Sequence, residues 1–391
     1  MRSEGDFISI NEWLLPFSWL YGLGVRLRNH LFDLGILKSK AYDIPVISVG
    51  NITVGGSGKT PHVEYLIRLL QSITQVAVLS RGYKRKTKGY RLATLQSAMT
   101  EIGDEPHQMK HKFPDVYVAV DNKRTRGIEH LTSDEDTRNV GVILLDDAFQ
   151  HRYVKPGINI LLVDYHRLII YDKLLPAGRL REPLDGKNRA DIVIITKCPK
   201  DLKPMEFRVL TKAMDLFPFQ DLYFTTIDYG DLHGIFHKKT VARKSIKRHH
   251  VMLLTGIASP EQIMTDLKPH CRKIEPVTFG DHHAFTDKDI EDINRRYAAM
   301  PEPKIIITTE KDASRLTETQ KLSKEVKQNI YTLPIHVRFM LDQEEGFNKK
   351  IIEYVRKNAR NGSLAQAEND HKPQDGHHLG NRPGTISFRD Y

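Results

Sequence analysis

Residues Asn51–Thr60 read NITVGGSGKT, a glycine-rich stretch whose residue types and spacing are suited to holding phosphate groups. Glycine lets the backbone curl so that successive N–H groups point at phosphate oxygens, and a following lysine can reach the terminal phosphates. The hydroxyl next to that lysine can bind Mg²⁺. The usual pattern has glycine where this chain has Thr53, but an expected strand before the stretch and an expected helix after it compensate. The residues that we predict to bind nucleotide phosphates are Thr53, Val54, Gly55, Gly56, Ser57, Gly58, Lys59 and Thr60.

An acidic pair, Asp146-Asp147, directly follows the apolar run Val142–Leu145. In proteins with a phosphate-binding loop, an aspartate at the carboxyl end of a buried strand helps to hold Mg²⁺ against the β- and γ-phosphates. Two acids after a strand also occur in solvated loops, but the glycine-rich stretch in the same expected sheet favours a metal. Because adjacent side chains diverge, one of the two carboxylates would face the ion. We predict that Mg²⁺ binds to Thr60 and to Asp146 or Asp147.

Transfer of a phosphoryl group to a hydroxyl needs a base near the acceptor, and two segments supply candidates. One is Asp104 in the run GDEP, and the other is the histidine pair in Asp281-His282-His283. Taken alone, the first is equally typical of a helix start and the second of a structural histidine pair. Their separation in the sequence would place them in different lobes, where an Asp–His pair could form across a closing cleft.

The elements that would position these residues are short apolar runs alternating with helical patterns. Such runs, buried on both faces, are typical of the parallel sheet of a doubly wound α/β protein. A helical pattern, His62–Leu70, follows the glycine-rich stretch. The expected strands are Ile44–Val49, Val76–Leu79, Val116–Val120, Val140–Leu145, Ile158–Asp164 and Ile192–Thr196.

The alternation of strand and helix patterns is interrupted at Leu222–Tyr229. It resumes with strand-like runs at Val251–Thr255 and Lys304–Thr309. We therefore expect a second, smaller α/β unit that ends near Arg356. The polar remainder, with few apolar residues, is typical of a disordered tail. The expected organisation is an N-terminal helix over 1–36, a phosphate-binding domain over 37–222, a β linker over 223–250, a smaller domain over 251–357 and a tail over 358–391.

The net charge and the composition limit the kinds of molecule that this protein can be expected to bind. The 391 residues include 59 Lys and Arg against 49 Asp and Glu, so the net charge of +10 favours an anionic partner. Two cysteines exclude a disulfide framework and fit a reducing compartment. Trp13–Val25 is an uncharged run of thirteen residues followed by basic ones. It is shorter than the ~20 residues that span a bilayer, so it suits either an interfacial helix over anionic lipid or a helix docked on its own domain.

Two other classes of protein compete with an enzyme. A nucleotide-dependent switch or GTPase would need a guanine-selecting motif, and Thr196-Lys197 begins one, but Pro199 stands where that motif has aspartate. A nucleic-acid-binding protein would fit the basic charge, but the basic residues are dispersed and no recognition motif is present. We expect no nucleic-acid partner.

Taken together, the motifs closely resemble those of the tetraacyldisaccharide 4′-kinase (lipid A 4′-kinase) family. The resemblance spans about residues 13–340 and includes a phosphate loop like the one found here. It implies two α/β/α domains joined by a two-stranded linker, with a P-loop-like larger sheet and an interfacial N-terminal helix. The matching blocks are VGNITVGGSGKTP, SRGY, GDEP, LLDDAFQH, LLPAGRLREP, TGIASP, FGDHHAF and TEKDA.

The resemblance implies a peripheral enzyme on the cytoplasmic face of a Gram-negative inner membrane. It would transfer the γ-phosphate of ATP, with Mg²⁺, to the 4′-hydroxyl of an acylated glucosamine disaccharide 1-phosphate. Apart from the resemblance, we expect a monomer. Asp104 resembles the family's catalytic base and His282 its partner. Arg181, Gln150 and His151 resemble residues that face the substrate.

Overall fold

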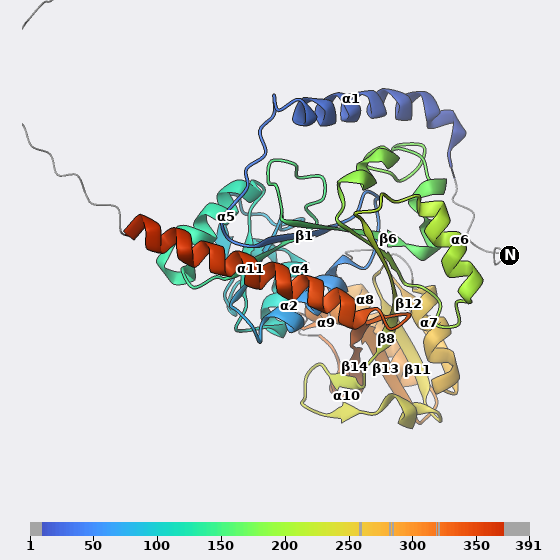
Figure 1. Cartoon of the computed structure of the whole chain (residues 1–391). Coiled ribbons are helices and arrows are strands. Elements are labelled where there is room, and N and C mark those ends of the chain that lie inside the picture. Colours follow the sequence, from blue (N-terminus) through green and yellow to red (C-terminus); the bar gives the residue numbers. More distant parts are fainter. Residues whose placement is uncertain are drawn as a thin grey trace, which may run out of the picture.

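The structure is a computed structural model and describes residues 10–370 except 258–259, 281–282, 284, 318 and 320. The described chain forms two α/β units and a helix that lies along one edge of the larger unit (Figure 1). This architecture confirms the α/β class and the N-terminal helix predicted from the sequence.

The larger unit is built on a nine-stranded sheet in the order β15-β8-β7-β6-β1-β5-β2-β4-β3. The pairs β3–β4 and β15–β8 are antiparallel, and the remaining neighbours are parallel. All six strands predicted for this unit are present. The strands are β1 (Val46–Gly50), β2 (Val76–Ser80), β3 (Arg91–Leu92), β4 (Tyr117–Val120), β5 (Val142–Asp146), β6 (Ile158–Asp164), β7 (Ile192–Thr196), β8 (Asp221–Tyr229) and β15 (Ile335–Phe339).

Helices cover both faces of this sheet, because its central strands alternate apolar side chains between two cores. Ile47 and Val49 of β1 belong to a core with the helices α2 and α11, whereas Val46 lies in the opposite core with α5. A third cluster buries Phe207 and Leu210 of α6. The helices are α2 (Lys59–Leu70), α3 (Met99–Ile102), α4 (Asp104–Lys112), α5 (Arg124–Ser133), α6 (Pro204–Met214) and α11 (Glu344–Asp370).

The smaller unit has a six-stranded sheet in the order β10-β9-β14-β13-β11-β12. Its strands are β9 (Leu232–Gly234), β10 (Thr240–Val241), β11 (His250–Thr255), β12 (Lys273–Thr278), β13 (Lys304–Thr309) and β14 (Ile330–Leu333). Its helices are α7 (Glu261–Leu267), α8 (Asp287–Ala299), α9 (Glu310–Leu316) and α10 (Lys324–Asn329). Short 3-10 helices lie at Glu12–Leu14, Glu135–Thr137, Tyr165–Arg167, Ile169–Tyr171, Leu184–Arg189, Arg243–Ile246 and Lys268–His270.

The boundaries between the units differ from those predicted. The chain leaves the larger unit along β8 and returns along β15, and these two strands pair side by side in the larger sheet. β9 and β10, expected in the linker, belong to the smaller sheet, while β15 and α11, expected in the smaller domain, belong to the larger unit. The hydroxyl of Tyr354 on α11 donates to the carbonyl of Val46 at 3.2 Å and so ties the helix to β1.

Helix α11 also corrects the predicted extent of the tail. It continues to Asp370, so the expectation of a disordered segment is wrong for residues 358–370. Alanine, leucine, glutamate and glutamine between 364 and 368 are good helix formers, which outweighs the polar composition. The remaining residues of the predicted tail, 371–391, lie outside the described residues.

Helix α1 (Leu15–Asp33) lies apart from the two sheets, at the top of the view in Figure 1. One face of it is tied to the larger unit: the hydroxyl of Ser18 donates to the carbonyl of Leu174, and Ala177 N donates back to that hydroxyl. Large apolar side chains occupy the outer face, and the indole of Trp19 is 73% exposed. The helix is therefore docked on its own domain, and because its outer face is apolar, an interfacial position over lipid stays a prediction.

Candidate active site

The glycine-rich stretch forms a turn between β1 and α2, as its sequence predicts. Gly55 and Gly58 have φ angles of 118° and 80°, in the region that favours glycine, and Gly58 immediately precedes the first helical residue, Lys59. The backbone N–H groups that begin α2 are thus available to an anion. The side chain of Asn51 donates to the hydroxyl of Ser57 at 2.8 Å and braces the turn from inside.

A second strand end braces the same turn. The hydroxyl of Thr196, at the end of β7, donates to the carbonyl of Ser57 at 3.0 Å, and the ammonium group of Lys197 donates to the carbonyl of Gly56. The carboxylate of Asp164 holds that ammonium group at 2.6 Å. The Thr-Lys pair that superficially suggested a guanine-selecting motif therefore supports the phosphate loop.

Lys59 and Arg181 converge on Asp147. The Lys59 Nζ lies 3.6 Å from the Asp147 Oδ1, and the Arg181 Nη1 lies 3.3 Å from the Asp147 Oδ2. Burial alone would raise the pKa of Asp147, but the two cations outweigh it and lower that pKa. The structure thus brings together a predicted nucleotide ligand, a predicted substrate ligand and one member of the acidic pair.

Asp146, unlike Asp147, has no ion-pair partner among the described residues. Its carboxylate is fully buried, and among the described residues neither oxygen has a hydrogen-bond partner. Burial, then the charges of Glu105 and Asp147, raise its pKa to about 7, against the opposing effects of Lys59 and Arg124. A buried carboxylate without partners is a group that a bound cation would stabilise.

Asparagine at position 146 is expected to stabilise the metal-free protein increasingly as the pH rises from 4 to 7. In the unfolded chain this carboxyl ionises near its ordinary value of 3.8, whereas in the folded protein it keeps its proton up to about pH 7. The folded state therefore binds more protons in this window, so the free energy of unfolding of the native protein falls as the pH rises. Calorimetry in EDTA should give a higher Tm for Asp146→Asn than for the native chain at pH 8, by a few degrees.

The neighbouring residue provides a matched control of opposite sign. The pKa of Asp147 is lowered in the folded protein, so Asp147→Asn should reduce the Tm at pH 8. A difference between Asp146→Asn and the native chain that stays constant from pH 4 to 8 would contradict the assignment of a raised pKa to Asp146.

Asp104 is the first residue of α4, and the turn before it is tightly packed. Gly103 has a φ of 94°, and a Cβ there would lie 3.0 Å from the carbonyl of Tyr83, so the SRGY and GDEP motifs lie against each other. The negative charge of the neighbouring Glu105 contributes to the raised pKa of Asp146. Asp104 itself meets the smaller unit: its Oδ2 accepts from the Arg315 Nη2 at 2.5 Å.

The predicted partner of Asp104, His282, lies outside the described residues, so the pair stays a prediction. The adjacent His283 is described and has a local role. Its ring stacks on Phe279 with centroids 4.8 Å apart, and its Nε2 lies 2.9 Å from the Asp289 carboxylate. The Asp104–Arg315 contact shows that Asp104 faces the smaller unit, as a pair across two lobes requires.

The two remaining predicted substrate residues lie on the Arg181 side of the site. The side chain of Gln150 donates to the carbonyl of Asn51, and its Oε1 lies 3.5 Å from the Arg181 Nη1. Burial and nearby arginines, led by Arg124, lower the pKa of His151 to about 4. His151 is therefore a neutral ring near neutral pH.

Helix α1 touches this same group. The hydroxyl of Tyr21 donates to the carbonyl of Arg181 at 2.8 Å, and Arg28 donates to the carbonyl of Gln150 at 3.2 Å. The docked face of α1 is thus hydrogen-bonded directly to the backbone of two predicted substrate ligands, Arg181 and Gln150.

Three site residues escaped the sequence analysis: Glu105, Arg124 and Arg315. Arg124 is 2% exposed and donates to the backbone carbonyl of Asp146 at 3.1 Å. The position of Glu105 next to Asp104 in GDEP could have indicated a site residue. Arg124 could not be recognised, because an arginine within the charged run DNKRTR is typical of an exposed surface. Among the described residues, no group of three or more His, Cys, Asp or Glu side chains could hold a metal ion.

Comparison with known proteins gives one consistent result. A family model described as tetraacyldisaccharide-1-P 4′-kinase matches residues 10–356. Tetraacyldisaccharide 4′-kinase of Phocaeicola vulgatus is 59% identical over 365 residues, which cover 93% of this chain and 100% of the relative. The corresponding protein of Porphyromonas gingivalis strain W83 is 45% identical and covers 90% of this chain and 99% of its own.

A solved structure is similar as well. LpxK from Aquifex aeolicus, crystallised in complex with ATP, superposes with a TM-score of 0.67 at 31% identity. The match covers 88% of this chain and 98% of the Aquifex chain. A nucleotide switch or GTPase is not favoured by any of these relatives. The chain belongs to the tetraacyldisaccharide-1-P 4′-kinase family and is an ATP-dependent kinase of lipid A biosynthesis.

Proposed function

We propose that the site assembled around Asp147 transfers the γ-phosphoryl group of ATP to the 4′-hydroxyl of a tetraacylated glucosamine disaccharide 1-phosphate. The observation that carries this proposal is the convergence of Lys59 and Arg181 on Asp147, next to a buried carboxylate without partners. A nucleotide ligand and a substrate ligand that share one carboxylate would hold the γ-phosphate of the donor close to the acceptor sugar.

Residues 53–60 would bind the phosphates of ATP. The positive φ angles at Gly55 and Gly58 expose backbone N–H groups, and Lys59 begins the helix whose N-terminus faces the turn. The Aquifex relative, crystallised in complex with ATP, supports this nucleotide.

The donor set around Asp146 and Thr60 fits Mg²⁺. Carboxylate and hydroxyl oxygens suit this ion, and in phosphate-loop proteins the nucleotide phosphates and water supply the other ligands, so no cluster of three acids is needed. The unpartnered oxygens of Asp146 favour it as the carboxylate closest to the ion, while Asp147 is already neutralised by two cations. When bound, Mg²⁺ would neutralise charge that develops on the phosphates.

Asp104 would accept the proton of the 4′-hydroxyl, with His282 as its partner. It is the first residue of α4, and the charge of the next residue, Glu105, contributes to the raised pKa of Asp146. Arg181, Gln150 and His151 would face the phosphate and sugar of the lipid. Since Arg181 and Gln150 hydrogen-bond to α1, the acceptor would enter from the side of that helix.

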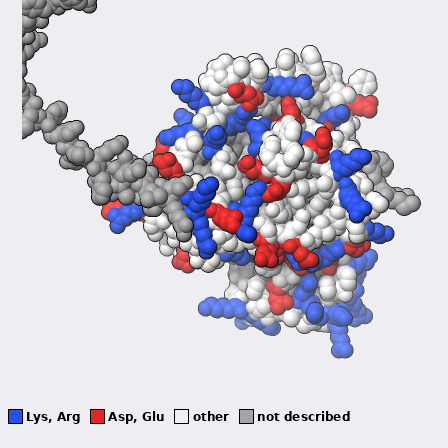
Figure 2. Space-filling view, viewed as in Figure 1, with Lys and Arg blue, Asp and Glu red and all other residues white. Residues whose placement is uncertain are grey.

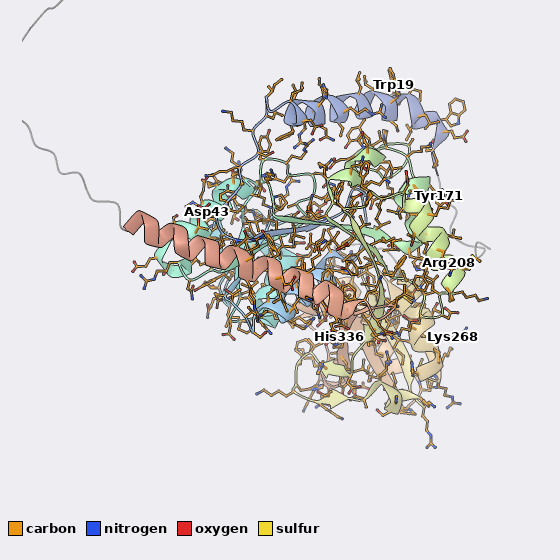
Figure 3. All side chains as sticks on the ribbon, viewed as in Figure 1. Trp19, Asp43, Tyr171, Arg208, Lys268 and His336 are labelled. Carbon is orange, nitrogen blue, oxygen red and sulfur yellow. The ribbon has the colours of Figure 1, made fainter. Side chains whose placement is uncertain are left out.

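Helix α1 would place the enzyme on a membrane surface, where a multiply acylated substrate remains. Side chains that hold it to the protein, Ser18, Tyr21 and Arg28, lie on one face, and large apolar side chains lie on the other. In Figure 3, Trp19 is at the outer edge of the molecule, and Figure 2 shows largely uncharged surface along that edge with basic and some acidic side chains beside it. No helix within the described ranges is long and apolar enough to cross a membrane.

We infer from this surface a peripheral enzyme on anionic lipid. The family resemblance, and not the surface, supports the cytoplasmic face of a Gram-negative inner membrane, and we expect the enzyme to act as a monomer. The exposed apolar face comprises Trp13, Phe17, Trp19, Leu20, Leu23 and Leu27, which are 55–90% exposed. Such a face beside basic residues is the combination that interfacial helices use.

Serine at Phe17, Leu20 and Leu27 together is expected to weaken membrane binding at least ~10-fold. Each lost side chain removes roughly 1 kcal/mol or more of apolar burial, and 1.4 kcal/mol is a factor of ten. Co-sedimentation with phosphatidylethanolamine–phosphatidylglycerol vesicles measures the effect. The control carries Val209→Ser and Phe219→Ser, two exposed apolar residues away from α1, and should bind as the native chain does. Equal loss in both proteins would move the membrane contact away from α1.

The experiment that tests the proposed reaction follows label from γ-³²P-ATP into a detergent-solubilised acylated disaccharide 1-phosphate in the presence of Mg²⁺. Label that chromatographs with a 4′-phosphorylated lipid supports the proposal. Release of inorganic phosphate without labelled lipid would exclude this acceptor.

A further inference from the structure

Within the described residues, helix α4 of the larger unit packs against helix α9 of the smaller unit, at a place where the two α/β units meet. The two helices run antiparallel, because an ion pair joins the start of each helix to the end of the other. The Asp104 Oδ2 lies 2.5 Å from the Arg315 Nη2, and the Lys112 Nζ lies 2.6 Å from the Glu310 Oε1. Only the first of these two ion pairs involves the proposed base.

The guanidinium of Arg315 is bound by residues of its own unit as well as by Asp104 of the larger unit. Arg315 is 8% exposed, and its Nη1 lies 3.1 Å from the Oδ1 of Asp312, which is completely buried. The other oxygen of Asp312 accepts from the Gly256 N at 2.9 Å and from the Thr309 hydroxyl at 2.7 Å. The guanidinium is therefore fixed relative to the smaller sheet.

This arrangement also explains two motifs to which the proposed reaction gives no role. Gly256 belongs to TGIASP, and a Cβ at that position would lie 2.9 Å from the Asp312 Oδ1. Thr309 and Asp312 belong to TEKDA, where the threonine caps α9 by accepting from the Asp312 N at 3.1 Å. Gly256 and Thr309, one residue from each motif, therefore hold the buried Asp312 behind Arg315.

The contact with Asp104 is directional. Two nitrogens of Arg315, Nη2 at 2.5 Å and Nε at 3.1 Å, both donate to the same oxygen, Oδ2. Two donors on one oxygen fix the rotation of the carboxylate about its bond to the chain and therefore fix the direction of the other oxygen. A group that must accept a proton within hydrogen-bond distance depends on that direction.

We propose that Arg315 is a positioning residue for phosphoryl transfer, which reaches from the smaller unit to orient the carboxylate of Asp104. The inference rests on the proposed role of Asp104 as the base. It assigns Asp312, Thr309 and Gly256 to the support of Arg315, and it makes docking of the smaller unit a condition for a correctly oriented base.

The test compares Arg315→Gln and Arg315→Lys with a matched control, Glu310→Gln, in the full chain. Glu310→Gln removes the ion pair at the other end of the same helix pair, and Lys112 keeps its second partner, Glu64, at 2.7 Å. Arg315→Gln should lower kcat by about 10- to 100-fold with both KM values within about twofold, because misplacing a reacting group by ~1 Å costs about that much. Arg315→Lys should recover part of kcat, and Glu310→Gln should keep it.

A double-mutant cycle identifies the path of the effect. If Arg315 acts through Asp104, adding Arg315→Gln to Asp104→Asn should lower kcat no further. Multiplied losses in the double variant, or equal losses in Arg315→Gln and Glu310→Gln, would overturn the proposal in favour of general domain docking. A kcat for Arg315→Gln that equals or exceeds that of the native enzyme would also overturn it.

The outcomes separate this proposal from the one on which it rests. If Asp104→Asn is inactive while both Arg315 variants keep full kcat, the base stands and the positioning role fails. If Asp104→Asn retains full kcat, the base assignment itself fails. If Arg315→Gln is unfolded at the assay temperature, the kcat of the folded Arg315→Lys variant tests the proposal instead. A kcat for Arg315→Lys as low as that of Asp104→Asn would contradict positioning by a cation.

Discussion

Replacing Asp104 by asparagine is expected to lower kcat by about 10²- to 10⁴-fold, the range attributed to a positioned general base. Asparagine has nearly the same size and still offers an oxygen to Arg315, but it cannot take the proton of the acceptor hydroxyl. The nucleotide phosphates are expected to bind at residues 53–60, at the other end of the transfer, so the Kd for ATP should stay within about twofold. Single-turnover transfer to the acylated disaccharide and calorimetric titration with ATP measure the two quantities.

The control for this variant is Asp115→Asn, an exposed aspartate shortly after the end of the same helix, α4. It should transfer phosphate at the native rate. Native turnover by Asp104→Asn would remove Asp104 as the base, whereas a loss shared by both variants would point to damage of α4. A large rise in the Kd for ATP with Asp104→Asn would show that the aspartate acts on the nucleotide.

The phosphate loop and the acidic pair could be predicted because each is a local pattern. Positive φ at Gly55 and Gly58 is a property of the residue itself, and Asp146 and Asp147 directly follow a strand that the apolar run reveals. Neighbours in sequence do not, however, share an environment. The sequence could not tell that Asp147 would be paired with two cations and Asp146 buried with none.

Contacts between distant segments were the part that the sequence concealed. The apolar residues Phe347, Ile351 and Val355 predict a helix with one buried face, but they carry no information on which unit buries it. The strand β15 is equally ambiguous, because its pairing with β8 spans more than a hundred residues. The predicted domain boundary therefore failed where the chain returns to the larger sheet.

The same limit applies to Arg315. The spacing of Asp312 and Arg315 on one helix suggests an ordinary exposed pair, worth a few tenths of a kcal/mol. Its importance follows from burial and from a partner about two hundred residues away, neither of which is a local property. Residues that join the two units are thus the ones that local motifs describe least well.

Alanine at Lys59 is expected to reduce transfer by about 10³-fold or more. Lys59 is the only charged residue in the sequence of the turn, residues 51–60, and it stands at the start of α2. Its ammonium group would neutralise the terminal phosphates, where charge develops during transfer. It is also oriented in advance, since it lies 3.6 Å from the Asp147 Oδ1 and its side chain is only 14% exposed. Its removal thus takes away a fixed charge rather than a mobile one.

Stability should change little in this variant, because Asp147 keeps its contact with Arg181 at 3.3 Å. The measurement is single-turnover transfer with saturating ATP, alongside the Tm of each protein. Lys212→Ala, which removes an exposed lysine from α6, is the matched control and should keep native activity. Transfer by Lys59→Ala within about tenfold of the native rate would mean that the phosphate loop binds ATP through its backbone alone, since the loss of one positioned charge at the transferring group normally exceeds that factor.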